Sequence, residues 1–445
     1  MSNPPALRSI LDRLAQITLA RWLVVAGVFH LSITLAIFLI GHFRLFPNTF
    51  DEHGIGISFA IDGVTYRGMI EDLAETLKHA GFSAWLDIQA PLHCRLYSLV
   101  FIFPGGLVGY NILAAETLNL LCYLGVLSFV YLLGKEILGR SSGLVAAAII
   151  GVWPSFLVHS TQLLRDPLSI LFMLILLIVL TILLGRQLSW RSSLLIGTGS
   201  IVLVVMFWLT RGNIWNIVFA TLALTAILYL IRIVKERRVF APNLALLAVI
   251  FFSVLFVPTK FESTTLPGSK PPTALITIPA GQVTGSHSFF TRLIAQINGR
   301  RDAFNRYSGK SSNMDANIIF KTGGEVIRYL PRAAVVGLFA PFPRMWFEDG
   351  TAGRAGRILT GLETFAMYLL YLPAMICVWN RRRHLTMWLI FLVAMVGMIA
   401  LGLVVVNAGA LFRLRYVFWM LVIVLAVEGV KILRRKGNPN ESLRS

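Results

Sequence analysis

Long apolar runs recur along the whole chain, and they limit its possible folds more than any other feature. A helix needs about 18 or more apolar residues to cross a bilayer. Ten runs are long enough: 20–42, 110–133, 141–159, 166–185, 192–210, 213–232, 240–258, 358–379, 386–407 and 413–433. Only 14% of the 445 residues are charged, against about 25% in an average soluble domain. We therefore expect an all-α polytopic membrane protein with about ten transmembrane helices.

The basic residues are arranged as topology signals. The net charge is +19, and strongly basic chains often bind nucleic acid. Here, however, most of the excess falls in short clusters between apolar runs, such as 232–238, 381–383 and 434–436. Lys and Arg near the end of a span are retained in the cytoplasm. We expect membrane lipid as a partner and no nucleic acid.

The short turns alternate in charge when the N-terminus is placed inside. Two or more basic residues occur in each of the turns then predicted to be cytoplasmic: 134–140, 185–191, 232–238, 380–384 and the tail from 431. At most one occurs in each of the opposite turns: 159–165, 210–212 and 407–411. Ten crossings put both termini in the cytoplasm. The heavy use of arginine and the lack of a long lumenal domain favour a bacterial inner (plasma) membrane.

This topology leaves two large outer segments. The predicted parts are a cytoplasmic N-terminus (1–19), a seven-helix transmembrane module (20–258) with its first outer loop (43–109), a large basic outer loop (259–357), three C-terminal transmembrane helices (358–433) and a cytoplasmic tail (434–445). Helical spacing of apolar residues from Tyr66 to Leu77 predicts an amphipathic helix in the first outer loop. The apolar pieces 91–104 and 331–343 are too short to cross, so we expect interfacial or re-entrant helices there.

Acidic residues at the outer ends of spans are candidates for chemistry, because a carboxylate near hydrocarbon is costly. Asp166 begins the fourth span, and Asp62 precedes the amphipathic helix; Asp51 and Glu52 are competitors in the same loop. Two such acids on one side of the membrane can supply a general base and a second group that orients substrate or binds a metal. A purely structural alternative exists for each. Asp166 can cap its helix while paired with Arg165, and Asp62 can form a turn with Gly63.

Arginines gather at the same outer span ends. Seven lie at these ends or in the second outer segment: Arg165, Arg211, Arg328, Arg332, Arg344, Arg413 and Arg415. Arginine binds phosphate oxygens bidentately and stays charged near lipid. This pattern favours a lipid-linked phosphate or pyrophosphate head group as ligand. The alternative is that long loops escape the positive-inside bias and simply carry charge.

Motifs for other chemistries are absent from the sequence. There is no Gly-rich phosphate loop, no His-Glu-x-x-His and no Gly-x-Ser-x-Gly, which disfavours cytosolic nucleotide-driven mechanisms. Cys94, Cys122 and Cys377 fall in or beside apolar segments without the spacing of a disulfide framework or a zinc site.

The order of features in residues 20–185 resembles a known family. An outer loop with Asp-x-x-x-Tyr and a helix ending in Gly is followed by Pro-Leu-x-x-x-Leu-Tyr, a Gly-Lys-x-x-x-Gly turn, an Ala-rich span ending in Trp-Pro, and an acidic-Pro step. The matching stretches are 62–81, 91–97, 134–139, 143–154 and 163–168. This order resembles the GT-C superfamily of polyprenyl-phosphate-dependent membrane glycosyltransferases, in the protein mannosyltransferase and aminoarabinose transferase group.

The resemblance implies inverting transfer of a sugar from a polyprenyl phosphate to a lipid-linked glycan, lipid or protein acceptor. It assigns the base to Asp62 and the second acidic position to Asp166, where a divalent cation (Mg or Mn) would bind if one is used. Phosphate or lipid-head binding falls to Arg165, Arg211, Arg344, Arg413 and Arg415, and substrate binding to Tyr66, His93 and Tyr416. The family often has Asp-Glu at the first site, whereas Gly63 follows Asp62 here. Asp51 and Glu52 therefore stay open as the alternative first acid.

Two other functions fit part of the pattern. A polysaccharide polymerase or ligase of the Wzy or O-antigen-ligase kind would use the basic second outer segment to bind a lipid pyrophosphate, but the early-loop helix and the Asp166 step fit it poorly. A transporter or flippase would place ionisable groups inside spans, where Glu116 and Glu363 lie. The sequence contains no convincing internal repeat of the transporter kind.

Overall fold

The computed structural model describes residues 18–47, 49–50, 56–57, 61–260, 289–307, 312–348 and 353–437. In these ranges the regular elements are helices, accompanied only by isolated bridges between single residues. Eight helical segments are long and apolar enough to span a membrane, or nine when a bent helix pair is counted as one span. The chain is therefore an all-α polytopic membrane protein.

The spanning segments follow the predicted apolar runs closely. They are α2 (Leu19–His42), α7 (Ile112–Leu138), α10 (Asp166–Gly185), the joined helices α11 (Trp190–Arg211) and α12 (Trp215–Glu236), α13 (Ala241–Lys260), α16 (Gly353–Asn380), α17 (Leu385–Val404) and α19 (Tyr416–Gly437).

The chain reverses direction between α11 and α12, at the 3-10 turn Gly212–Ile214. Arg211, at the end of α11, pairs with Asp166 at the start of α10. Arg232, near the end of α12, donates to the carbonyl oxygens of Leu183 and Arg186 at the other end of α10. The 47-residue segment Trp190–Glu236 is therefore a helical hairpin.

The run 141–159 is not one straight helix as expected. The structure has α8 (Arg140–Gly151) and α9 (Pro154–Ser160), bent by 69°. Pro154 occupies the first turn of α9, and Trp153 before it is extended, with φ −69° and ψ 114°. A residue that precedes proline avoids the α region because of a clash with the proline ring. The helix therefore ends before Trp153 and restarts in a new direction.

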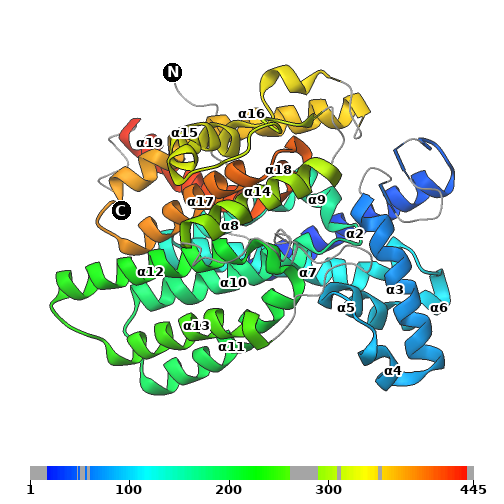
Figure 1. Cartoon of the computed structure of the whole chain (residues 1–445), viewed down its shortest axis with the longest axis horizontal. Coiled ribbons are helices and arrows are strands. Elements are labelled where there is room, and N and C mark those ends of the chain that lie inside the picture. Colours follow the sequence, from blue (N-terminus) through cyan, green and yellow to red (C-terminus); the bar gives the residue numbers. More distant parts are fainter. Residues whose placement is uncertain are drawn as a thin grey trace, which may run out of the picture. The chain divides into compact units, whose positions relative to one another are not determined.

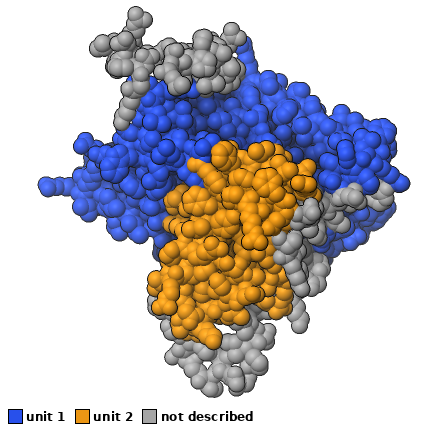
Figure 2. All heavy atoms as spheres, turned by 90° about the horizontal axis from the view of Figure 1, so that it is seen from above, with its two compact units in different colours: residues 1–263, 369–393, 419–445 blue, residues 264–368, 394–418 orange. Residues whose placement is uncertain are grey.

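Two compact units make up the chain (Figure 2). Unit 1 contains residues 1–263, 369–393 and 419–445, and unit 2 contains 264–368 and 394–418. The three C-terminal spans α16, α17 and α19 each contribute residues to both units.

The centre of unit 1 is α7, which packs against α2, α8 and α10, while α11 packs against α10 and α13 (Figure 1). The first outer segment also belongs to this unit. It contains α3 (Ile61–His79), α4 (Gly81–Asp87), α5 (Leu92–Ile102) and α6 (Gly105–Val108). The expected helix of this segment is α3, and its Tyr66, Ile70 and Leu73 are buried. Since α3 packs on α5 and α5 on α7, the segment is anchored to the spans.

The basic turns predicted to be cytoplasmic meet at one end of unit 1. Hydrogen bonds join each turn to the next: Arg186 to Glu136, Arg232 to the Arg186 carbonyl, Lys235 to the Arg383 carbonyl, Arg381 to Glu428, and Lys431 to Ser141 and Ser142. Turns that the charge pattern assigns to one side of the membrane thus lie together in space.

Unit 2 contains α14 (Phe289–Tyr307), α15 (Gly323–Phe339), the 3-10 turn Pro343–Trp346 and α18 (Ala408–Leu414), with parts of α16 and α17. The short apolar piece expected from residue 331 is only part of a helix that starts upstream. Thr322 caps α15 by accepting from the Glu325 amide, and the Glu325 carboxylate accepts from the Lys321 amide. This reciprocal cap fixes the start of α15, and Pro331 lies within the helix.

Candidate functional site

An ion pair buried among the spans forms the base of the candidate site. Asp166 is the first residue of α10, and Arg211 is the last of α11. Their side chains are 4% and 5% exposed, and Arg211 Nη1 lies 2.5 Å from Asp166 Oδ1. The carboxylate is also favoured by its place at a helix N-terminus. The alternative pairing of Asp166 with its neighbour Arg165 is wrong, because the partner is Arg211.

Arg165 is half-buried beside this pair, and its side chain makes no hydrogen bond or ion pair with any residue that the structure describes. Its charge acts on the neighbouring side chains of Tyr66, His93 and Cys94. A guanidinium group in this setting is available to an anionic ligand. Arg165 was predicted to bind a phosphate or lipid head group, with pairing to Asp166 as the alternative, and Asp166 pairs with Arg211 instead.

Tyr66 of α3 and His93 of α5 bring the first outer segment to this place. Their rings meet edge to face, with centroids 4.4 Å apart. Burial raises the pKa of Tyr66, while the positive charge of Arg165 opposes this, and the charges of Asp62 and Asp166 add to the rise. The charges of both candidate acids and of Arg165 therefore act on the Tyr66 hydroxyl, so these residues lie close to one another.

His93 is held neutral in the site. Burial lowers its pKa well below the usual value, and the positive charges of Arg165 and Arg211 lower it further, against the opposing effect of Asp166. Its side chain is nearly inaccessible, and Nδ1 has no hydrogen-bond partner in the described part of the chain. A buried polar atom without a partner is costly, and a ligand hydroxyl can supply the missing hydrogen bond.

Asp62 lies in the first turn of α3, one helical turn before Tyr66, and is half-buried. The next residue, Gly63, is buried, yet no atom of the described residues lies within 4 Å of the position that a Cβ would take. The competing acids Asp51 and Glu52 lie outside the described residues.

The short non-helical segment that leads to Asp166 is held by buried side chains from other elements. Asn119 of α7 donates to the Thr161 carbonyl at 2.9 Å, and its own oxygen accepts from the Tyr97 hydroxyl at 2.6 Å. The Gln162 side chain accepts from the Ile57 amide at 2.9 Å. Asn119 and Gln162 were not among the site residues predicted from the sequence. The usable signal was Glu116 with Asn119 at i and i+3, which puts both polar groups on one helical face.

The remaining arginines of the predicted set belong to unit 2. Arg344 is highly exposed, with its Nε 3.7 Å from Glu348. Arg415 is fully buried, donates to the Gly337 carbonyl at 3.0 Å, and lies over the ring of Phe412. Arg413 is half-buried and Tyr416 is buried. Arg415 is thus bonded to the backbone inside unit 2.

Other basic residues of the second outer segment are also engaged within unit 2. Arg301 donates to the carbonyls of Leu403 and Asp315, at 2.7 and 2.6 Å. Arg332 pairs with the Asp315 carboxylate at 2.9 Å. Hydrogen bonding to Arg332 is the main cause of a lowered pKa of Asp315, with a further contribution from Tyr329.

Within the described ranges, no three His, Cys, Asp or Glu side chains are grouped as metal ligands. Asp166, the residue named for a divalent cation, has its carboxylate paired with Arg211. The sequence matches no protein-family model and no curated protein.

Proposed function

We propose that this chain is a membrane glycosyltransferase of the GT-C type, which moves a sugar from a polyprenyl phosphate to an acceptor on the periplasmic side of a bacterial inner membrane. The observation that carries the proposal is Arg165. Its half-buried cation has no partner in the described chain and lies in the same neighbourhood as two acids and a neutral histidine. Such a site suits a phosphate attached to a hydroxyl-rich group.

The proposed topology follows from the same residues. Ten crossings are counted when α11 and α12 are separate spans and α8 with α9 forms one broken span. Both termini are then cytoplasmic. The joined basic turns face the cytoplasm, and the Asp166 end of α10 faces the periplasm, where the first outer segment also lies.

In the proposed reaction the acceptor hydroxyl oxygen attacks the anomeric carbon while the Asp62 carboxylate takes its proton. The bond between the anomeric carbon and the phosphate oxygen breaks, and the polyprenyl phosphate leaves with the electron pair. Arg165 stabilises the charge on the leaving phosphate. The Asp166–Arg211 pair orients this region, and His93 Nδ1 bonds a sugar hydroxyl.

Transfer from a panel of labelled polyprenyl-monophosphate sugars, by the purified chain in proteoliposomes, tests this proposal. The Asp62→Asn variant is expected to lose on the order of a hundredfold in rate, the contribution of a general base. Arg165→Gln is expected to raise the donor KM by about 10- to 100-fold, since a charge-assisted hydrogen bond contributes about 1.5–3 kcal/mol. Asp72→Asn is the matched control, because Asp72 is exposed on the same helix.

Retained transfer in both Asp62→Asn and Asp166→Asn would overturn the assignment of the site. Transfer from pyrophosphate-linked glycans alone would favour the ligase alternative, and flux through liposomes without a covalent product would favour a transporter. The engagement of Arg301 and Arg332 within unit 2 weakens the ligase alternative, since that function relies on the basic second outer segment.

A further inference from the structure

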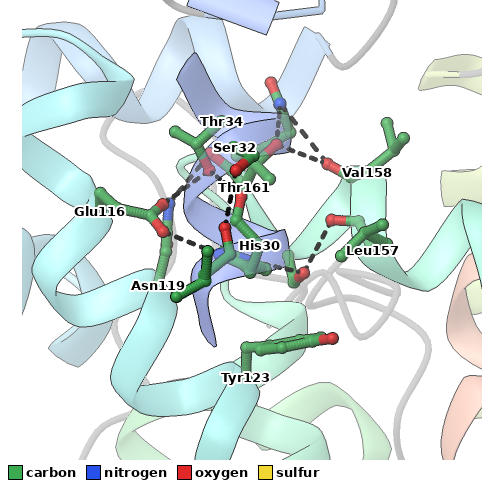
Figure 3. A network of polar contacts seen from close by, with 12 residues as sticks. His30, Ser32, Thr34, Glu116, Asn119, Tyr123, Leu157, Val158 and Thr161 are labelled. Atoms are coloured by element: carbon green, nitrogen blue, oxygen red, sulfur yellow. Dashed lines mark hydrogen bonds and ion pairs between the residues drawn. The ribbon is translucent and has the colours of Figure 1, made fainter. Parts of the chain in front are cut away.

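A second polar cluster is buried among the spans of unit 1, and the proposed reaction does not use it (Figure 3). His30 of α2 places Nδ1 2.8 Å from Glu116 Oε1 of α7. The other ring nitrogen, Nε2, lies 2.9 Å from Ser160 Oγ at the end of α9. Thr34 donates to Glu116 Oε2 at 2.8 Å. The ring of Tyr123 packs against the imidazole, with the two ring centroids 4.4 Å apart. Three elements therefore meet at one imidazole.

The hydrogen bonds fix where the protons lie. The Ser160 hydroxyl donates to the Leu157 carbonyl at 2.8 Å, so Ser160 Oγ accepts from His30, and Nε2 carries a hydrogen. The Thr34 hydroxyl lies 2.8 Å from Glu116 Oε2 and 3.2 Å from the His30 carbonyl oxygen, so its hydrogen is assigned to the shorter contact, with Glu116. A single proton is then shared between His30 Nδ1 and Glu116 Oε1, and the pair has no net charge wherever that proton lies. This explains how two ionisable groups are tolerated among apolar spans.

The cluster ends on the segment that carries the site. Ser160 is followed by Thr161, whose carbonyl accepts from Asn119. Asn119 lies on the same face of α7 as Glu116, close to it in Figure 3. The residues from Thr161 to Arg165 are not helical. Side chains of α7 and α5 bond their carbonyls: Asn119 donates to Thr161, and the Tyr97 hydroxyl lies 3.4 Å from Gln162 and from Leu164. His30 of α2 bonds Ser160, directly before them.

We propose that the His30–Glu116 pair is a positioning device, which fixes the segment 160–165 and thereby sets where Arg165 and Asp166 stand. The functional part of this inference rests on the proposed transfer reaction, and the structural part does not. The pair does not touch the substrate. It acts through Ser160, at the point where α9 ends and the non-helical segment begins.

Two substitutions of Glu116 distinguish a positioning role from a role in proton transfer. Glu116→Gln preserves the hydrogen bonds, because the amide donates to neutral His30 Nδ1 while its oxygen accepts from Thr34. Glu116→Ala removes them. The matched control is Glu428→Ala, which removes another buried carboxylate of unit 1, one that accepts from Ser142 and Arg381 at the cytoplasmic-turn end.

Hydrogen exchange by mass spectrometry, on the full chain in nanodiscs, is the substrate-free measurement. Peptides covering residues 157–168 are expected to exchange about tenfold faster or more in Glu116→Ala, and to match the wild type in Glu116→Gln and Glu428→Ala. In the transfer assay, kcat of Glu116→Ala is expected to fall on the order of a hundredfold, while Glu116→Gln and Glu428→Ala stay close to the wild type.

Unchanged exchange at 157–168 in Glu116→Ala would overturn the proposal. Equal loss of kcat in Glu116→Gln and Glu116→Ala would overturn it too, because the shared proton rather than the geometry would then be required. Absence of transfer by the wild type would defeat the proposed function alone, and the exchange measurement would still decide the positioning role. Glu116→Gln keeps the test informative if Glu116→Ala fails to fold.

Discussion

Asp166 and Arg211 show what a buried charge requires at the scale of a residue. Each is nearly inaccessible and each is the other's counter-charge. Removing one partner of a buried pair leaves an uncompensated ion, which costs more than the pair contributes in total. The two residues are therefore coupled in stability as well as in the proposed chemistry.

The Asp166→Ala variant is expected to lower the free energy of unfolding by about 3–5 kcal/mol, because Arg211 is left buried without its carboxylate. The double variant Asp166→Ala with Arg211→Met is expected to recover part of this loss. Denaturant unfolding in detergent, run as a double-mutant cycle, measures both effects. Strictly additive losses would contradict the coupling.

His93 predicts a pH dependence of stability. Its folded pKa lies well below that of the unfolded chain, through burial and the charges of Arg165 and Arg211. The unfolded state then binds more protons below about pH 6.5, so stability falls as the pH falls through that value, with a slope on the order of 1 kcal/mol per pH unit.

The measurement is the thermal midpoint of unfolding between pH 5 and 7.5, for the wild type and His93→Phe. The variant is expected to flatten the acid side of the curve, because a group that cannot be protonated has no such linkage. Identical pH curves for the two proteins would show that His93 is not the titrating group.

The residues of the site could be found from the sequence only in part. Asp166 and Arg211 occur at the ends of apolar runs, where the cost of a charge is visible without a structure. Asn119 and Gln162 lie inside or between such runs, and neutral polar residues there are ordinary. Their role depends on which backbone groups of a non-helical segment lack partners, and that is a three-dimensional property.

At the scale of elements, α7 and α8 pack through glycine. A Cβ on Gly134 would lie 2.6 Å from the Gly143 Cα, and a Cβ on Gly143 would meet the backbone of Tyr131 and Lys135. Backbone atoms cannot move aside as a flexible side chain can. The close contact between these helices therefore requires glycine at both positions, because a residue with a Cβ atom would clash with the facing backbone.

Gly134→Ala is expected to destabilise unit 1 by about 1–3 kcal/mol, the usual range for overpacking. Gly199→Ala is the matched control, because a Cβ there meets no described atom within 4 Å and alanine is the better helix former. Thermal unfolding of both variants in the same detergent measures the difference. A loss of equal size in both would contradict the packing argument.

The ends of helices could be predicted where the hydrophobicity of the sequence changes. They could not be predicted where a capping side chain or a proline sets the end. The ends of α2, α10 and α13 follow from apolar runs bounded by polar residues. The start of α15 follows from the reciprocal bonds of Thr322 and Glu325, and the break before α9 from Pro154. A hydropathy profile averages over many residues, so it does not detect such single-residue signals.

At the scale of the whole molecule, the charge pattern predicts which ends of unit 1 face which side. Ser83 is exposed on α4 of the first outer segment, and Gln187 is exposed in a basic turn. In intact cells, a membrane-impermeant maleimide is expected to label the Ser83→Cys variant and not Gln187→Cys. Permeabilised cells should allow both reactions.

The wild type is the background control for this labelling, because Cys94, Cys122 and Cys377 are buried. Burial raises the pKa of the Cys94 thiol to about 12, with the charge of Arg165 opposing the rise, so little reactive thiolate forms near neutral pH. Labelling of Gln187→Cys in intact cells would invert the proposed topology.

The joined basic turns also set an order of assembly. Ser142 and Glu428 are 286 residues apart in the sequence, and Lys431 and Arg381 lie in the same cluster. During synthesis, α8 is made long before its carboxylate partner on α19 exists. The hydrogen bonds of this cluster can therefore form only after α19, the last span, has been made. A chain truncated before α19 would leave Arg381, Ser141 and Ser142 without Glu428 and Lys431.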